Sequence, residues 1–459
     1  MDGQVHTRSI TEAVADWIAP WIAGTAIPPD CEATAHRLLL DVAGLCVAAR
    51  NETYVHAVLA STELGGACTA IGHPGAFNAY DAALINGTAA HGEDYDDTFE
   101  GGPIHSGAVV VPAVLALAER ERLPGSAVLR GIVIGAELMC RLSLVAPKAI
   151  HRAGFHPTAT IGALAAAAGC AAALGLSPSK SVHTIGIAGS MASGIIEYLA
   201  EGTWTKRMHA GWAAQSGIRA ALMGRAGFLG PRTVLEGTHG FFNAFAPSRT
   251  AEFAHVLDGL GTRWWMPTIA FKPYPCGTMT QPFIDCALAL RALGVDPDQI
   301  ATITCNVGEG TVHRLWEPLA AKQRPETPYA GKFSTPFCIA VAVLDGRAGF
   351  GQFTEARIHD PAVQRLAAKI GYAIDPDDEY PRNFTGHLHA TMADGTVHEL
   401  RQPHMRGGAH APLADAEFNR KFMDNAVYGG WAPPQADRLH NALAALFDAP
   451  AIDLTDARA

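Results

Sequence analysis

One segment limits the possible folds more than any other. The stretch "PTATIGALAAAAGCAAALGLSP", residues 157–178, has no charged side chain and is long enough to cross a bilayer. It consists largely of Ala and Gly, however, and no second stretch of the chain resembles it. A helix that is apolar all round is also typical of the core of a large helical protein. We therefore predict a helix buried on all sides, and no membrane span.

The surrounding sequence supports a helical body. Through residue 265, apolar residues recur at spacings of three and four, Gly or Pro closes the segments, and period-two alternation is scarce. Segments of this kind are residues 11–24, 31–50, 78–92, 107–123, 126–146 and 211–231.

The pattern changes after Trp264-Trp265. Residues 298–308 alternate as a half-exposed strand does, and residues 384–400 predict a hairpin that turns at Asp394-Gly395. Helical spacing returns at residues 335–349 and 360–373, and again in the C-terminal tail. We therefore predict a mainly α protein. A large all-helical domain would comprise residues 1–267 and 404–459, and a smaller α+β domain residues 268–403.

Net charge limits the possible partners, and cysteine content indicates the cellular compartment. The chain of 459 residues has 44 acidic and 34 basic side chains, for a formal net charge of −10. This balance argues against a nucleic acid or an anionic membrane as the partner. The nine cysteines form no CxxC pair, and the N-terminus lacks a secretion-signal pattern. We expect a cytoplasmic protein with reduced thiols.

The stretch "HGEDYDDTFEGGPIH", residues 91–105, carries the densest titratable chemistry and runs directly into an apolar segment. It fails the EF-hand pattern, because Phe99 stands where a loop that begins at Asp94 needs Gly. Asp94, Thr98 and His105 surround a Gly-Gly-Pro turn that could direct them into a cleft, and the helix start near Gly107 offers an anion site. The alternative is an acidic, solvated loop with helix caps.

Two further stretches offer a base and a cation. His156 precedes Pro157 in extended backbone at the start of the apolar helix, where it could stay neutral and act as a general base. Lys206 and His209 lie three residues apart, and the lysine could bind a substrate carboxylate. The alternatives are a structural histidine beside a helix and an ordinary surface lysine.

A fourth stretch, "FKPYPCGTMTQ", contains Lys272 at the predicted domain junction, and junctions of this kind often hold ligand clefts. Cys276 has no nearby partner histidine, so we expect it to pack. The chain has no HExxH, Walker A or GxGxxG motif for a metal or nucleotide. Together, the four stretches indicate acid–base chemistry on a small anionic substrate without a cofactor or a metal.

The same stretches resemble the MmgE/PrpD family, which includes 2-methylcitrate dehydratase, cis-aconitate decarboxylase and iminodisuccinate epimerase. The resemblance covers nearly the whole chain, through "HGEDYDDT", "GFHPTATIGALAAAA", "WTKRMHAGWAAQSG", "FKPYPCG" and "GKFSTPF". It implies a helical domain with a smaller α+β lid, usually in a homodimer. It also implies a cofactor-independent active site between the two domains.

The resemblance carries site residues onto this sequence by motif. Those it implies for catalysis are Asp94, Thr98, His105, His156, Lys206 and Lys272. We expect the substrate-binding residues to be Ser106, His209, Tyr274, Gly277 and Phe337. At two of these positions the sequence departs from the decarboxylase pattern, because Gly277 stands where those members have histidine and Phe337 where they have tyrosine.

The expected function is a lyase that acts on a small di- or tricarboxylate by removing a proton next to a carboxylate, through dehydration or decarboxylation. Three alternatives remain open. One is epimerisation of an iminodisuccinate-like dicarboxylate. The second is a carboxylate-binding protein without catalysis, and the third is a metal-dependent hydrolase.

Overall fold

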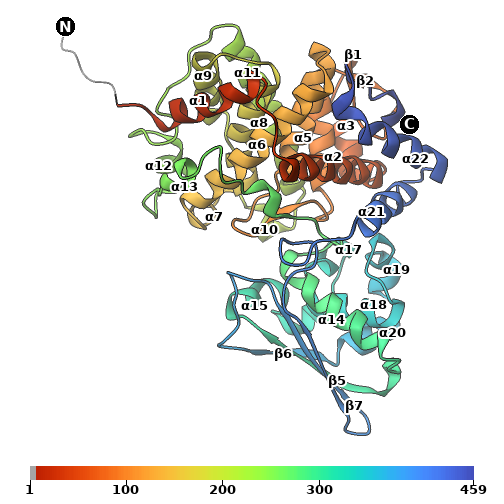
Figure 1. Ribbon diagram of the computed structural model, residues 1–459. Helices are drawn as coiled ribbons and strands as arrows, with labels where there is room; N and C mark the ends of the chain where they lie inside the picture. Colours follow the sequence, from red (N-terminus) through yellow and green to blue (C-terminus); the bar gives the residue numbers. More distant parts are fainter. Residues whose placement is uncertain (1–6, 459) are drawn as a thin grey trace. The chain divides into compact units, whose positions relative to one another are not determined.

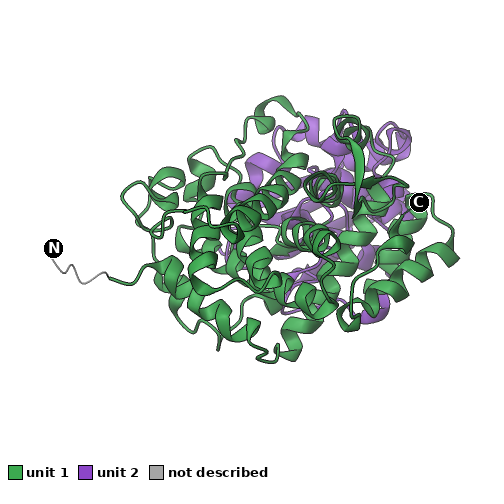
Figure 2. Ribbon diagram, turned by 90° about the horizontal axis from the view of Figure 1, so that it is seen from above, with its two compact units in different colours: residues 1–92, 96–269, 418–459 green, residues 93–95, 270–417 purple. Residues whose placement is uncertain are grey.

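The computed structural model describes residues 7–458 (Figure 1). The chain divides into two compact units, coloured separately in Figure 2. The helical unit extends to Gly92, continues over Asp96–Ile269, and includes the chain from Phe418 to the C-terminal end. The mixed unit comprises Glu93–Tyr95 and Ala270–Glu417. Compared with the predicted limits, residues 404–417 and the short segment 93–95 belong to the mixed unit. The prediction that the N-terminus lacks a secretion signal rests partly on the first six residues, which lie outside the described range.

The helical unit confirms the mainly α prediction. Its longer helices are α1 (Ile10–Ile22), α2 (Pro29–Ala49), α4 (Ala79–His91), α5 (Gly107–Glu121), α6 (Gly125–Val145), α8 (Pro157–Ala173), α9 (Pro178–Gly189), α11 (Thr205–Arg225), α21 (Asp415–Tyr428) and α22 (Pro433–Ala444). Shorter ones are α3 (Thr53–Leu59), α7 (Ala149–Arg152), α10 (Tyr198–Glu201), α12 (Phe241–Phe245) and α13 (Ala254–Leu257). The first three residues of α21 belong to the mixed unit.

Helix α8 forms the centre of this unit. All of its residues are buried, as predicted, and it packs against α5, α6, α9 and α11. The many small residues allow close helix packing: a Cβ on Gly87 of α4 would lie 2.5 Å from the Cα of Gly211 in α11. Among the residues described, no helix combines the length and the apolar character that a membrane crossing requires.

Both ends of the chain contribute to the helical unit. The C-terminal helix α22 packs on α2 near the N-terminus. Lys421 of α21 forms a 2.6 Å ion pair with Asp41 of α2, and both side chains are buried. A buried pair of this kind holds the two helices in one register, because either charge alone in the core would be costly.

The expectation of an all-helical domain needs one correction. Strands β1 (Leu64–Thr69) and β2 (Ala76–Phe77) form a small antiparallel pair, and β3 (Thr98–Phe99) is a third short strand. The β1–β2 register shifts between Leu64 and Cys68. Gly66 makes this bulge possible, because its φ is +147° and a Cβ there would lie 2.2 Å from the carbonyl oxygen of Phe77.

The mixed unit is built around a four-stranded sheet. The strands lie in the order β6-β5-β7-β8. Strand β5 (Ile300–Val307) is parallel to β6 (Ile370–Ile374) and antiparallel to β7 (Gly386–Met392). Strand β7 in turn pairs antiparallel with β8 (Val397–Gln402). The predicted strand and the hairpin that turns at Asp394-Gly395 are confirmed. The helix predicted over 360–373 is wrong at its end, because α20 (Pro361–Ala367) stops and the chain enters β6.

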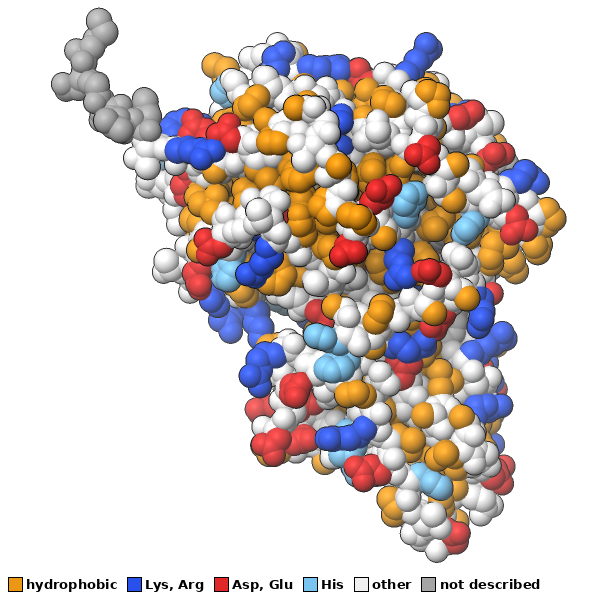
Figure 3. Space-filling model, in the orientation of Figure 1, with side chains coloured by type: hydrophobic (Ala, Val, Ile, Leu, Met, Phe, Trp, Pro, Cys, Tyr) orange, Lys and Arg blue, Asp and Glu red, His pale blue; other side chains and the backbone are white. Residues whose placement is uncertain are grey.

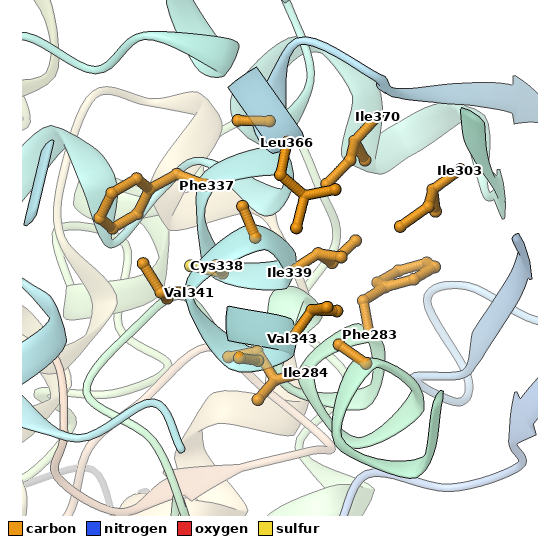
Figure 4. Packing of buried hydrophobic residues seen from close by; sticks show 14 of the residues in the cluster. Phe283, Ile284, Ile303, Phe337, Cys338, Ile339, Val341, Val343, Leu366 and Ile370 are labelled. Atoms are coloured by element: carbon orange, nitrogen blue, oxygen red, sulfur yellow. The ribbon is translucent and has the colours of Figure 1, made fainter. Parts of the chain in front are cut away.

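Helix α14 (Gln281–Ala292) packs on β7 and β8 of this sheet, and α18 (Thr335–Asp345) packs on α14. The shorter helices of the unit are α15 (Glu309–Leu315), α16 (Leu319–Gln323), α17 (Pro328–Gly331) and α19 (Glu355–Ile358). The two-residue strand β4 (Ile269–Ala270) leads into the unit. Figure 4 shows Ile339 and Val343 of α18 pointing toward Phe283 of α14 and Ile303 of β5. This buried apolar cluster is the core of the mixed unit.

Candidate functional site

The structure divides the predicted site residues between the two units. Thr98, His105, Ser106, His156, Lys206 and His209 belong to the helical unit. Asp94, Lys272, Tyr274, Gly277 and Phe337 belong to the mixed unit.

Four histidines form one continuous cluster in the helical unit. His91 is the last residue of α4, His105 lies two residues before α5, His156 is the N-cap of α8, and His209 lies on α11. The ring centroid of His91 lies 4.9 Å from that of His105 and 5.6 Å from that of His156, against which it stacks. The Nδ1 atoms of His156 and His209 are 3.2 Å apart. The fold thus gathers imidazoles that are far apart in the sequence.

Asp96 orients two of these rings. Its Oδ2 lies 2.7 Å from Nδ1 of His91 and 3.4 Å from Nδ1 of His105, and the Asp96 and His91 side chains are fully buried. Nδ1 of His105 also lies 2.6 Å from the carbonyl oxygen of Asp97. Since a carbonyl only accepts, Nδ1 of His105 carries the hydrogen, and Nε2 is the nitrogen that can exchange a proton with another molecule.

Burial keeps the other two rings neutral. Desolvation, with a smaller effect from the nearby His91 and Lys206, holds the pKa of His156 well below its ordinary value. The same causes lower the pKa of His209 to about 4. A neutral imidazole can accept a proton, so His156 has the protonation state that a general base needs at neutral pH.

Asp97 occupies the helix N-terminus that we expected to bind a substrate anion. Its carboxylate accepts hydrogen bonds from the backbone N–H groups of Ser106 and Gly107, and from the hydroxyl of Ser106 at 3.0 Å. Burial and the neighbouring carboxylates raise the pKa of Asp97 to about 8, while these bonds act to lower it. The start of α5 is therefore filled by a side chain of the protein itself, which also holds Ser106.

Two further residues of the helical unit are Thr98, which was predicted, and Tyr198, which was not. Thr98 is buried in β3, next to the Gly101-Gly102 turn that the sequence indicated. Tyr198, which sequence reasoning missed, presents its ring to His156 and His209 at centroid distances of 6.1 and 5.8 Å.

In the mixed unit, the segment 93–95 is held by one predicted residue, Lys272, and one further residue, Tyr329. Lys272 Nζ donates to the carbonyl oxygen of Asp94 at 2.8 Å, and the Tyr329 hydroxyl donates to the Asp94 carboxylate at 2.6 Å. Asp94 has φ +55°, an uncommon conformation for a residue other than glycine. The lysine and the tyrosine fix this strained residue from two sides, and Lys272 is almost fully buried.

A buried ion pair fixes the same segment next to Asp94. Lys332 donates to the Glu93 carboxylate and, at 3.0 Å, to the Glu93 carbonyl oxygen. The Lys332 ammonium also lies 5.2 Å from the ring centroid of Phe350. The side chains of Lys332 and Glu93 are only 3% and 12% exposed. Lys332 comes from the "GKFSTPF" stretch, which the sequence had marked only as a family motif.

The other predicted residues of this unit have clear structural partners. The hydroxyl of Tyr274 donates to Asp285 at 2.6 Å and accepts from Arg406 at 2.7 Å, and burial raises its pKa. The N–H of Gly277 donates to the Lys332 carbonyl oxygen at 2.9 Å. Phe337 is buried and packs against Phe353 within the apolar cluster of Figure 4. Their expected roles in substrate binding remain predictions.

Sequence reasoning also missed the pair that organises the histidines. His91 and Asp96 stand in the quoted acidic stretch, but nothing in the residue pattern shows that a turn of five residues brings them together. One ligand atom from each of His91, Asp96 and His105 would lie within 4.8 Å of the others, so these residues could also hold a divalent ion.

Comparisons with known proteins agree with the motifs. Residues 12–254 match the model of the MmgE/PrpD N-terminal domain, and residues 274–443 match that of the MmgE/PrpD C-terminal domain. Cis-aconitate decarboxylase of Homo sapiens is 30% identical over 75% of this chain and 72% of its own length. The Mus musculus protein of the same name is 29% identical over 75% of this chain and 71% of its own. The Aspergillus terreus protein is 30% identical over 79% of this chain and 77% of its own. The chain therefore belongs to the MmgE/PrpD family of enzymes.

Proposed function

We propose that the protein is a cofactor-independent lyase that moves a proton on a small di- or tricarboxylate, by decarboxylation or dehydration. The observation that carries this proposal is the continuous cluster of four histidines with one buried carboxylate, in a chain of this family. The decarboxylases among its relatives make cis-aconitate the first substrate to test.

In the proposed reaction His156 is the base, because its ring is neutral and adjoins the other imidazoles. The ammonium of Lys206 acts on the same rings and would neutralise a substrate carboxylate. His105 would deliver a proton through Nε2, since its Nδ1 hydrogen is held by the Asp97 carbonyl. Asp94 is a second candidate base, and Lys272 a second carboxylate ligand.

The two reactions use these groups differently. In decarboxylation the bond to the leaving carboxylate breaks, carbon dioxide departs, and the electron pair spreads into the conjugated carboxylate. His105 or His156, once it has taken up a proton, then supplies that proton to carbon. In dehydration a base removes the proton next to a carboxylate, and the hydroxyl leaves with a proton from the acid. Return of the proton to the opposite face would give epimerisation, the alternative outcome.

The test is turnover of cis-aconitate, 2-methylcitrate and iminodisuccinate in deuterated water, followed by NMR. We expect deuterium on the carbon next to a carboxylate with one of these acids. Binding without any exchange would favour the carboxylate-binding alternative.

One observation favours a second candidate, metal-assisted hydrolysis, because His91, Asp96 and His105 could hold an ion. Turnover that persists after EDTA treatment and dialysis supports the first proposal. Activity that needs an added divalent ion supports the second.

A further inference from the structure

A second group of metal-ligating side chains lies in the mixed unit, on the polar face of its sheet. The residues of β7 alternate strictly, with Leu388 and Ala390 buried in the core and His387 and His389 on the opposite face. The period of two in a strand places His387 and His389 side by side, and their ring centroids are 4.4 Å apart. None of these residues has a role in the proposed function.

The neighbouring strand adds a carboxylate to this pair. Glu399 of β8 stands directly opposite His389 in the ladder, and its Oε1 lies 2.8 Å from Nε2 of His387. One ligand atom from each of His387, His389 and Glu399 lies within 4.8 Å of the others. Ligand atoms around a tetrahedral zinc ion are about 3.3 Å apart, so rotations of the exposed carboxylate and the imidazoles bring all three into range.

The third strand supplies the partner that a metal-bound imidazole requires. Asn306 of β5 stands opposite His387, and its side-chain amide lies 3.1 Å from Nδ1 of that ring. If a metal takes Nε2, the ring hydrogen moves to Nδ1, and a half-turn of the amide places the Asn306 oxygen there as the acceptor. A hydrogen bond of this kind orients histidine ligands in known metal sites.

We propose that His387, His389 and Glu399 form a binding site for one divalent transition-metal ion, with zinc the best match to two imidazoles and a carboxylate. The ion would join β7 to β8 across the hairpin and leave one coordination position for water. Because the three residues lie on a rigid sheet, the site is largely formed before the ion binds. Figure 3 shows several histidines, in pale blue, on the surface of the mixed unit. The Glu399 side chain is 58% exposed, so an ion can reach the site from solution.

The experiment is calorimetric titration of the EDTA-stripped full-length protein with zinc chloride, followed by cobalt substitution. We expect His389→Ala to lose one equivalent of zinc or to weaken its binding at least about tenfold. Glu399→Gln should act in the same direction, because it keeps a hydrogen-bond acceptor for His387 but removes the charge. Cobalt in the wild-type site should give the visible absorption bands of a tetrahedral centre.

The matched control is His398→Ala, because His398 lies between Glu399 and Val397 on the other face of β8 and should not change the titration. His105→Ala separates this site from the histidine cluster of the helical unit, since it should leave the equivalent lost in His389→Ala intact. Two results would overturn the proposal. One is a wild-type protein that binds no zinc, and the other is zinc binding that His389→Ala and Glu399→Gln leave unchanged.

Discussion

Asp96 and His91 form a fully buried carboxylate–imidazole pair, with 2.7 Å between Oδ2 and Nδ1. The carboxylate fixes the hydrogen of His91 on Nδ1, so Nε2 is left with its lone pair, and that atom is buried without a hydrogen-bond partner among the described residues. Since the His91 ring stacks on His156, the pair sets the position and electrostatic surroundings of the proposed base.

The first prediction concerns this pair. Asp96→Asn should lower kcat by about 100-fold with little change in KM, because an amide can donate to His91 and reverse its tautomer while it preserves the packing. The measurement is steady-state kinetics between pH 5 and 9. A structural role alone would instead lower the amount of folded protein and leave the kcat of the folded fraction and its pH profile unchanged.

The second prediction concerns stability and pH. The folded-state pKa of His209 is about 4, below its ordinary value of 6.5, so between these values the unfolded chain binds more protons than the folded one. The free energy of unfolding should therefore rise with pH over this range, by roughly 3 kcal/mol from His209 alone. His156 acts in the same direction.

Urea denaturation at pH 4.5, 5.5, 6.5 and 7.5 measures this slope. His209→Gln should flatten the slope. His359→Gln, at a histidine whose side chain is 65% exposed, should not. An equal slope in wild type and His209→Gln would contradict the assignment.

The third prediction concerns the anchor of residues 93–95. Lys332→Met should destabilise the mixed unit by about 3 kcal/mol, because it leaves the mostly buried Glu93 carboxylate without its cation. Lys369→Met, which removes only a bond to the Ile300 carbonyl oxygen, should cost clearly less. Lys332→Met with Glu93→Gln should recover part of the loss, and failure to recover it would rule out the ion pair as the cause. Thermal unfolding followed by circular dichroism compares the three variants.

The sequence predicted those parts of the fold that have strong periodicity. Helix α8 and the hairpin β7–β8 were found because their patterns extend over many residues. Strand β6 was missed because Ile370 follows α20 after two residues, and a short segment beside a helix has no separate period. Its strand character comes from parallel pairing with β5, which is a tertiary interaction.

The candidate site shows a similar limit. His105, His156 and Lys206 were predicted from loops that border apolar helices and from the family motifs. The sequence could not show that Asp97, rather than a substrate, occupies the start of α5, or that Asp96 pairs with His91. Those facts depend on which of several neighbouring carboxylates the turn directs inward.

The most direct test of the proposed function is deuterium incorporation from deuterated water by metal-free wild-type protein and by His156→Gln, with cis-aconitate as substrate. The wild-type protein should place one deuterium on carbon in each product molecule, and His156→Gln should lower the rate by about 100-fold or more while the variant stays folded. Equal rates of incorporation by the two proteins would show that His156 takes no part in the proton transfer. If the wild-type protein turns over neither cis-aconitate nor 2-methylcitrate nor iminodisuccinate, the proposed reaction itself is contradicted.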